Sequence, residues 1–383
     1  AHIHQDVKFY KNDLANGIID LKNWYFFRNL SNYTLNWEVL ANGEVVESGT
    51  IDNIVTAPQA KKTIQIPFKT AFKKDVEYFL NVAAVLKTDE PLLKAGYRVA
   101  YEQFQLQQAN VAIPEKATKS LTFKTKGDIV SVNGRDFNLT FNQKEGALTT
   151  YNFKNKSVLE SGPKVNFWRA PVDNDYGAGT QKRYKEWKDV VNAAKVTNAV
   201  KQLSKSEVQI TFTRDLFGGD AKLIETFLVD GNGVVKVTNE LKALKGKHSD
   251  FYKFGNKLVL PEAYKNITYY GKGPFEAYAD RQHAAKMGLF KQTVAGQYFP
   301  YIRPQETGNK LDVRWVSLIK EDGSGIKFLS EKPFSVSALN YREDDLHSGD
   351  EKGQHHVGEI DPRKEVFVNI DGFQQGLGSI NSW

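Results

Sequence analysis

The strongest constraint on the fold of this chain is a two-residue alternation of apolar and polar side chains that recurs between tight-turn dipeptides. The clearest alternating runs are residues 35–39, 63–68, 78–84, 208–212 and 235–237. The turn dipeptides are Asn16-Gly17, Asn42-Gly43, Asn133-Gly134, Asn232-Gly233 and Asp322-Gly323. Alternating strands joined by tight hairpins form antiparallel sheets, and no regular strand–helix alternation occurs. The sequence therefore predicts an all-β protein.

One segment of the chain shows clear helical spacing. Between Gln181 and Ala194, apolar residues recur at intervals of three and four with charged residues between them, which predicts one amphipathic helix. A second stretch, from Phe275 to Phe290, reads as helical or irregular.

A polar segment divides the chain into two unequal parts. Residues 105–120 contain a proline and show no strand period, which is typical of a linker. We assign residues 1–107 to an immunoglobulin-like β-sandwich, because their length and strand number suit that fold. Residues 108–122 form the predicted linker. Residues 123–383 are too long for a seven-stranded sandwich and predict a large antiparallel supersandwich.

Composition excludes several classes of function. The chain has no cysteine, which rules out disulfides, thiolate metal sites and cysteine nucleophiles, and leaves the compartment open. The net charge is +7, yet the lysines are scattered singly and lie beside no aromatic stacking platform, so we expect no nucleic-acid partner. No apolar run approaches the length that spans a bilayer, so we expect no membrane partner.

Two groups of carboxylates could carry acid–base chemistry. Glu276 and Asp280 lie four residues apart, beside Arg281 and His283, and would share a face with His283 if the segment were helical. We favour an internal ion pair between Glu276 and Arg281, because such pairs often fix loops. Glu306 lies in a loop rich in proline and aromatic residues, which also suits a structural role.

No metal site is predicted. Asp173-Asn174-Asp175 resembles the start of a calcium loop, but an EF-hand needs glutamate at the twelfth position, where this chain has Tyr184. A looser site for Ca²⁺, Na⁺ or Mg²⁺ stays an alternative. The histidines at 347, 355 and 356 lack a further ligand at a usual spacing.

The last residues point to a contact with something else. An alternating strand from residue 366 runs into a loop with three glycines and ends at Trp383. No chain follows to pack this indole into a core, so we expect it to be a contact surface. Tryptophan stacks on the apolar faces of sugars. We also expect the chain to be a piece of a larger enzyme.

Several segments together carry a resemblance to one family. They are residues 23–30, 95–104, 166–177, 270–281, 301–309, 312–315 and 369–383, which include Trp168-Arg169-Ala170-Pro171, Tyr278-Ala279-Asp280-Arg281 and Asn369-Ile370-Asp371-Gly372-Phe373. In this order they resemble the C-terminal portion of the bacterial β-galactosidases of glycoside hydrolase family 2. The resemblance covers essentially the whole chain.

The resemblance implies a five-domain parent that hydrolyses terminal β-D-galactose residues in β-galactosides. A jelly-roll domain, an immunoglobulin-like domain and a TIM barrel precede the two domains found here, of which the second is galactose-mutarotase-like. The barrel carries both catalytic glutamates and the ligands of Mg²⁺ and Na⁺. This chain is accordingly expected to be inactive alone and to hold no cofactor. Its expected partners are the galactoside, the parent's N-terminal and barrel domains, and further copies in a homo-oligomer, in the bacterial cytoplasm or periplasm.

The resemblance also implies roles for single residues. Trp383 matches the family's sugar platform, and Asp173, Asn174, Asp175 and Gly177 match the segment at the rim of the active site, with Gly177 as its hinge. The predicted scaffold residues are Arg169, Glu276, Asp280, Arg281, Arg303, Glu306 and Asn309. One departure is that the family continues past this tryptophan with further strands.

Two other functions stay open at this point. The chain could be a stand-alone galactoside-binding module. It could also be a mutarotase, which needs a histidine acid and a carboxylate base in one cleft. His283 with Glu276 or Glu306 is the only combination that the sequence offers.

Overall fold

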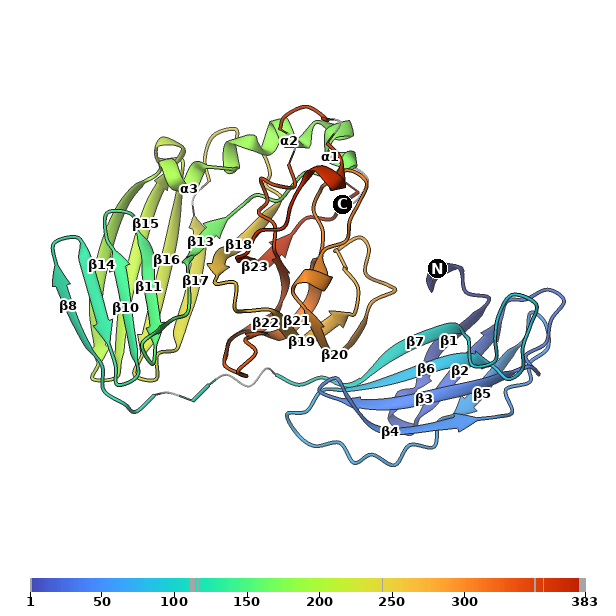
Figure 1. Cartoon of the computed structure of the whole chain (residues 1–383). Helices are drawn as coiled ribbons and strands as arrows, with labels where there is room; N and C mark the ends of the chain where they lie inside the picture. Colours follow the sequence, from blue (N-terminus) through green and yellow to red (C-terminus); the bar gives the residue numbers. More distant parts are fainter. Residues whose placement is uncertain are drawn as a thin grey trace.

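The computed structural model describes residues 2–110, 114–115, 117–242, 244–347, 349–353 and 355–378. Within these ranges the chain is built almost entirely from antiparallel strands, which confirms the all-β prediction (Figure 1). The described helices are short, and none of them is long and apolar enough to cross a membrane.

The first part of the chain is a sandwich of two sheets. One sheet has the order β1 (Val7–Asp13), β2 (Ile18–Asn23), β5 (Lys61–Gln65). The other has the order β4 (Glu44–Ile51), β3 (Tyr33–Ala41), β6 (Tyr78–Leu86), β7 (Arg98–Gln107). Two short 3₁₀ turns, η1 (His2–His4) and η2 (Leu14–Asn16), accompany them. On β3, Leu35, Trp37 and Val39 are buried between the sheets while Asn36 and Glu38 face outward, as the alternation predicts.

The second part has three hydrogen-bonded sheets within the described ranges. The five-stranded sheet is β12 (Lys156–Ser157), β11 (Ala147–Phe153), β10 (Phe137–Asn142), β9 (Ile129–Asn133), β8 (Thr122–Lys126). The four-stranded sheet is β14 (Lys195–Ser204), β15 (Glu207–Leu216), β16 (Ala221–Asp230), β17 (Val235–Lys242). The seven-stranded sheet is β13 (Ser161–Asn166), β18 (Lys253–Leu260), β23 (Val366–Gln374), β22 (Gly325–Leu339), β21 (Lys310–Ile319), β19 (Asn266–Gly273), β20 (Lys286–Thr293). One apolar core joins all three sheets, through residues such as Phe141, Phe212 and Val316.

Each of the five turn dipeptides lies at a connection between consecutive antiparallel strands. Asn42 and Gly43 have φ values of 48° and 89°, the left-handed pair that a tight hairpin between β3 and β4 requires. A side chain at residue 43 would also strike the second domain, because its Cβ would lie 2.6 Å from the backbone nitrogen of Leu289.

The helical prediction for residues 181–194 is wrong as a single helix. The chain instead forms α1 (Asp173–Ala178), α2 (Thr180–Arg183), η3 (Tyr184–Trp187) and α3 (Val190–Ala193), with breaks between them. Figure 1 shows α1 and α2 together at one end of the second domain. The further short 3₁₀ turns are η4 (Phe217–Gly219), η5 (Ala295–Gln297) and η6 (Val357–Glu359). Residues 275–285 are irregular and lead into β20, so Glu276, Asp280 and His283 do not share a helix face.

The two parts of the chain meet at a polar contact with an apolar border. The buried carboxylate of Glu77 accepts hydrogen bonds from Arg314 at 2.7 and 3.1 Å, and from the hydroxyl of Tyr270. Leu40 and Phe79 of the first part pack with Tyr270, Met287 and Trp315 of the second. A buried carboxylate paired with a guanidinium tolerates little displacement, so this contact fixes how the two parts are oriented.

Candidate functional site

Segments far apart in the sequence meet at the backbone of residues 376–378, just after β23. The guanidinium of Arg169 donates to the carbonyl of Gly376 at 3.4 Å, and the amide of Asn174 donates to the carbonyl of Leu377 at 3.1 Å. The carboxylate of Asp280 accepts from the backbone N–H groups of Leu377 and Gly378 at 3.1 and 2.7 Å. We call this set of contacts the 376–378 clamp. The clamp binds backbone carbonyl groups of residues 376 and 377 and backbone N–H groups of residues 377 and 378.

The clamp requires glycine at residue 376, because the backbone there lies close to the side chain of Asp280. A Cβ at residue 376 would lie 2.6 Å from the carboxyl carbon of Asp280. Any side chain there would push Asp280 away from the two N–H groups that it binds.

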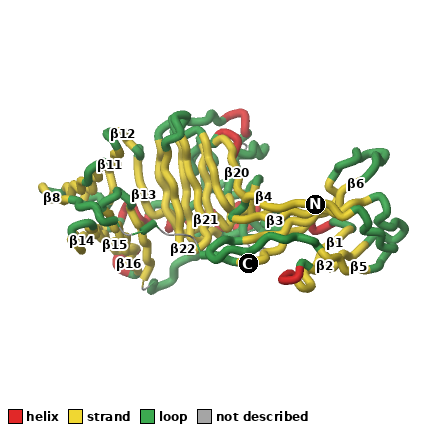
Figure 2. Tube along the Cα trace, turned by 90° about the horizontal axis from the view of Figure 1, so that it is seen from below, coloured by secondary structure: helices red, strands yellow, loops and turns green. Residues whose placement is uncertain are grey.

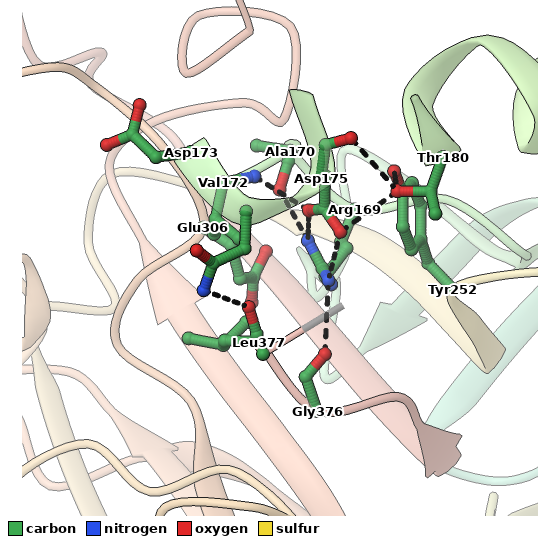
Figure 3. A network of polar contacts seen from close by, with 12 residues as sticks. Arg169, Ala170, Val172, Asp173, Asp175, Thr180, Tyr252, Glu306, Gly376 and Leu377 are labelled. Atoms are coloured by element: carbon green, nitrogen blue, oxygen red, sulfur yellow. Dashed lines mark hydrogen bonds and ion pairs between the residues drawn. The ribbon is translucent and has the colours of Figure 1, made fainter. Parts of the chain in front are cut away.

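A buried ion pair supports the clamp from beneath. Arg169 is fully buried, and its guanidinium binds the carboxylate of Asp175 through two hydrogen bonds of 2.6 and 3.3 Å (Figure 3). The same guanidinium lies 4.3 Å above the ring of Tyr252. Planar, two-point recognition of a carboxylate is a property of arginine that lysine lacks, which explains why an arginine suits this position.

The same ion pair explains where α1 begins. Asp175, the third residue of the helix, accepts the backbone N–H of Val172 at 2.8 Å, which satisfies one of the donors left free at the helix start. It also accepts the hydroxyl of Thr180 at 3.1 Å. The side chain of Asp175 is thus buried and engaged on both oxygens, so its role in this structure is to hold α1 against Arg169.

Asp173 and Asn174 occupy the outer side of α1. Figure 3 shows Asp173 directed away from the buried network. Its carboxylate is half exposed and pairs with Arg303 at 2.9 Å and with Lys352 at 3.0 Å. Partial burial alone would raise the pKa of Asp173, but these two cations hold it below its ordinary value. Gly177 lies within α1, where a Cβ would meet no other atom within 4 Å.

Glu276 ties together two of the loops beside the clamp. Its carboxylate binds Arg281, which confirms the predicted ion pair, and it also accepts the hydroxyl of Tyr301. It further accepts the hydroxyl of Thr307 at 3.1 Å and the backbone N–H of Gly308 at 2.8 Å. Because four protein donors bind this carboxylate, its role in the structure is to position the two loops.

Asn309 continues the same junction. Its side-chain amide donates to the backbone carbonyl of Ala277 at 2.8 Å, and its backbone carbonyl accepts the N–H of Ala277 at 2.8 Å. The loops at 276–281 and 301–309 are therefore held as one unit.

Charged side chains are also buried below the clamp. Lys253 lies between the carboxylates of Glu343 and Asp371, at 3.2 and 3.4 Å. Burial raises the pKa of Glu306, whose carboxylate accepts the amide of Gln374 at 3.1 Å. Burial also raises the pKa of Asp371 to about 7, although the ammonium of Lys253 opposes the shift.

Asp371 gives the stability of this chain a testable pH dependence. Folded Asp371 keeps its proton up to about pH 7, whereas an unperturbed aspartate releases it near 3.8. The folded state then binds more protons than the unfolded state, so folding loses stability as the pH rises through this window. We expect the free energy of unfolding of the wild-type chain, relative to Asp371→Asn, to fall between pH 5 and pH 7 and to level off above.

Urea unfolding of both proteins across this pH range measures the effect. The exposed Asp52→Asn is the matched control and should keep a constant difference from the wild type. A constant difference for Asp371→Asn as well would contradict the assignment.

The carboxylates of this site position neighbouring groups of the protein. Asp173, Asp175, Glu276, Asp280 and Glu306 are each engaged by the donors described above. A retaining glycosidase needs two carboxyl groups about 5 Å apart that act on the substrate, and these carboxylates instead bind protein groups. In the ranges that the structure covers, no group of three or more histidine, aspartate or glutamate side chains could hold a metal ion.

The structure separates the predicted residues into distinct groups. Arg169, Asn174 and Asp280 meet at the clamp, while Arg303 reaches Asp173 on its outer side. His283 makes no hydrogen bond or ion pair with Glu276 or Glu306 among the described residues. Trp383 lies outside the described residues. Sequence reasoning missed Thr180, Tyr252, Lys253 and Glu343, whose positions carry no local pattern that marks them.

Comparison with known proteins gives a consistent picture. Residues 133–383 match the family profile described as beta galactosidase small chain, and residues 19–107 match the profile described as beta-galactosidase, domain 4. The curated β-galactosidase of Priestia megaterium is 31% identical over 99% of this chain, and that of Streptococcus thermophilus is 26% identical over 100% of it. The chain spans 36% of the length of each of these two relatives.

Structural likeness adds little to this assignment. A putative mutarotase (YeaD) from Salmonella typhimurium is 12% identical, with a TM-score of 0.30, over 70% of this chain and 91% of its own. That score is too low to carry an argument. The sequence matches are sufficient by themselves, because the first profile spans about two thirds of the chain. The chain belongs to the beta-galactosidase small chain family and corresponds to the C-terminal portion of its β-galactosidase relatives.

Proposed function

We propose that this chain is the non-catalytic C-terminal part of an enzyme that hydrolyses terminal β-D-galactose residues in β-galactosides. Its task is to present the segment after residue 378 to an active site formed by another part of the enzyme. The 376–378 clamp carries this proposal, because it fixes the backbone from which that segment starts. Trp383 follows Gly378 by five residues in the sequence.

We assign separate roles to Trp383 and to the residues of α1. Trp383 stacks on the sugar, as an aromatic ring does on the apolar face of a pyranose. Asp173, Asn174 and Gly177 form the rim, because they lie on α1, whose Asn174 also binds the loop. Asp175 acts indirectly, by joining α1 to Arg169. Correct placement of binding groups accounts for much of enzymatic rate enhancement, so a positioning domain can be essential without supplying a catalytic group.

Hydrolysis of a chromogenic β-galactoside tests the proposal. The chain alone is expected to be inactive, and a mixture with the N-terminal remainder of the parent enzyme is expected to be active. Trp383→Ala should lower kcat/KM of the mixture by about 30-fold, the usual effect of removing an aromatic anchor. Trp24→Ala, at an exposed indole of the first domain, is the matched control and should retain activity.

Two outcomes would overturn the proposal. Hydrolysis by the pure chain would mean that it contains its own catalytic carboxylates. A mixture that assembles but is inactive, or that is equally active with Trp383→Ala, would contradict the proposal that this chain presents the segment after residue 378 to the active site.

A further inference from the structure

A concave site lies where the two parts of the chain meet, and none of the residues that line it takes part in the 376–378 clamp. Its floor is the outer face of the sheet that contains β3, β6 and β7, and its wall is formed by residues 273–275 and 284–290. Figure 2 shows β20 next to β3 and β4, and the N–H of Leu289 donates to the carbonyl of Gly43 at 3.1 Å. The cleft has a volume of about 600 Å³, which is within the usual range for small-molecule sites.

The floor of the cleft is a polar shelf around one small residue. Across the strands, Glu38 pairs with Asn81, and Asn36 pairs with Ala83, which in turn pairs with Tyr101. These residues share the outer face of the sheet, because side chains alternate along each strand. Ala83, the smallest of these side chains, lies between Asn36 and Tyr101 on the neighbouring strands.

Polar groups of this shelf are left without a partner in the described part of the chain. Arg98 makes no hydrogen bond or ion pair there, and its guanidinium lies 4.4 Å above the ring of Tyr101. Asn36 accepts one hydroxyl, from Thr50 at 3.1 Å, and its amide N–H₂ group is unused. Glu38 accepts from Asn81 at 3.2 Å through one carboxylate oxygen and keeps the other free. Donors and acceptors are thus available together.

Charge and apolar surface narrow the class of ligand. Arg98 and Lys286 are balanced by Glu38 and Glu102, and Lys286 already binds Glu102 at 2.5 Å. A cleft with balanced charge favours neither an anion nor a cation. On the wall, Phe275 is 49% exposed and offers an aromatic surface. Adjacent donors and acceptors beside an aromatic surface match a molecule that has many hydroxyl groups and an apolar ring face.

We propose that this cleft binds a neutral saccharide of one or two rings. Asn36 and Arg98 donate to its hydroxyl oxygens, and the free oxygen of Glu38 accepts a hydroxyl. Phe275 packs on the ring. The site stands apart from the clamp and does not depend on the proposed function, because every residue named in it belongs to the floor or wall of this cleft.

Lactose binding to the whole 383-residue chain tests this site, by isothermal titration calorimetry and by amide chemical shifts. An exposed site of this kind predicts a Kd on the order of 1 mM. Arg98→Met and Phe275→Ala should each weaken binding at least about tenfold, because each removes a principal contact. Arg135→Met, at an exposed arginine of the second domain with no partner among the described residues, is the matched control.

The ligand class is tested with two further probes. Mannitol has hydroxyls without a ring face, and citrate is an anion, so neither should bind at the concentration that saturates the site with lactose. Absence of lactose binding at 20 times the expected Kd, about 20 mM, would overturn the proposal. Lactose binding that Arg98→Met and Phe275→Ala leave unchanged, or a preference for citrate, would do the same.

Discussion

Replacing Arg169 with methionine is expected to lower the free energy of unfolding by about 3–5 kcal/mol, the cost of breaking a buried ion pair from one side. The substitution leaves the Asp175 carboxylate buried without its cation, because the side chains of Arg169 and Asp175 are 0% and 1% exposed. It also removes the hydrogen bond to Gly376. Urea unfolding followed by circular dichroism and tryptophan fluorescence measures the change.

Lys182→Met is the matched control for this prediction. Lys182 also pairs with a carboxylate, that of Glu351, but both side chains are more than half exposed. Exposed pairs contribute about 0–1 kcal/mol, so this variant should unfold nearly as the wild type does. Asp175→Asn, alone and combined with Arg169→Met, completes a double-mutant cycle. Additive effects, or a loss at Arg169 no larger than at Lys182, would contradict the structural role of the pair.

Replacing Asp280 with alanine is expected to lower kcat/KM of the assembled enzyme by about 100-fold, the effect that a displacement of 1 Å can have on a reacting group. Asp280 is the only described residue whose side chain accepts the N–H groups of Leu377 and Gly378. Its side chain is exposed, so stability should change much less than for Arg169→Met. The expected signature is a large loss of activity with a folded chain.

Three further variants define this result. Asp280→Asn keeps one carbonyl acceptor and should lose less activity. Gly376→Ala should reproduce the loss from the other side, because its Cβ would displace the Asp280 carboxylate. Asp52→Ala, an exposed aspartate of the first domain, should have no effect. Hydrogen exchange at the Leu377 and Gly378 amides in the isolated chain should accelerate in Asp280→Ala, and this readout does not depend on the proposed function.

Unchanged exchange at these two amides would contradict the clamp itself. Faster exchange with unchanged kcat/KM would support the hydrogen bonds of the clamp but contradict its role in activity. The two measurements therefore separate the geometry of the loop from the function proposed for it.

The strands could be predicted because their signal is local. Burial on one face of a strand imposes a two-residue period, and tight hairpins need residues that adopt positive φ, as Asn42 and Gly43 do. The sheet order has no such signal. The seven-stranded sheet places β13, β18 and β23 side by side, although more than 80 residues of sequence separate each from the next.

The helix prediction for residues 181–194 was wrong about continuity, although the burial pattern that it was based on is correct. Tyr184, Trp187 and Val190 are buried, as their spacing predicts. The indole N–H of Trp187 donates to the carbonyl of Ser249 at 2.9 Å, and the chain turns from η3 into α3 at residues 188–189. Short helical turns satisfy the same apolar period as one long helix, so the period alone does not reveal a break.

Local signals were enough to predict the all-β class, the hairpins, the pairing of Glu276 with Arg281 and the resemblance to a family. Each of these depends on residues that are close together in the chain or on motifs that can be read in order. The packing of distant segments, by contrast, brings Arg169, Asn174 and Asp280 to one loop. It also places Lys253 between Glu343 and Asp371. These partners are up to 207 residues apart. Their contacts arise from how the sheets pack, and packing between distant segments leaves no periodic trace in a single sequence.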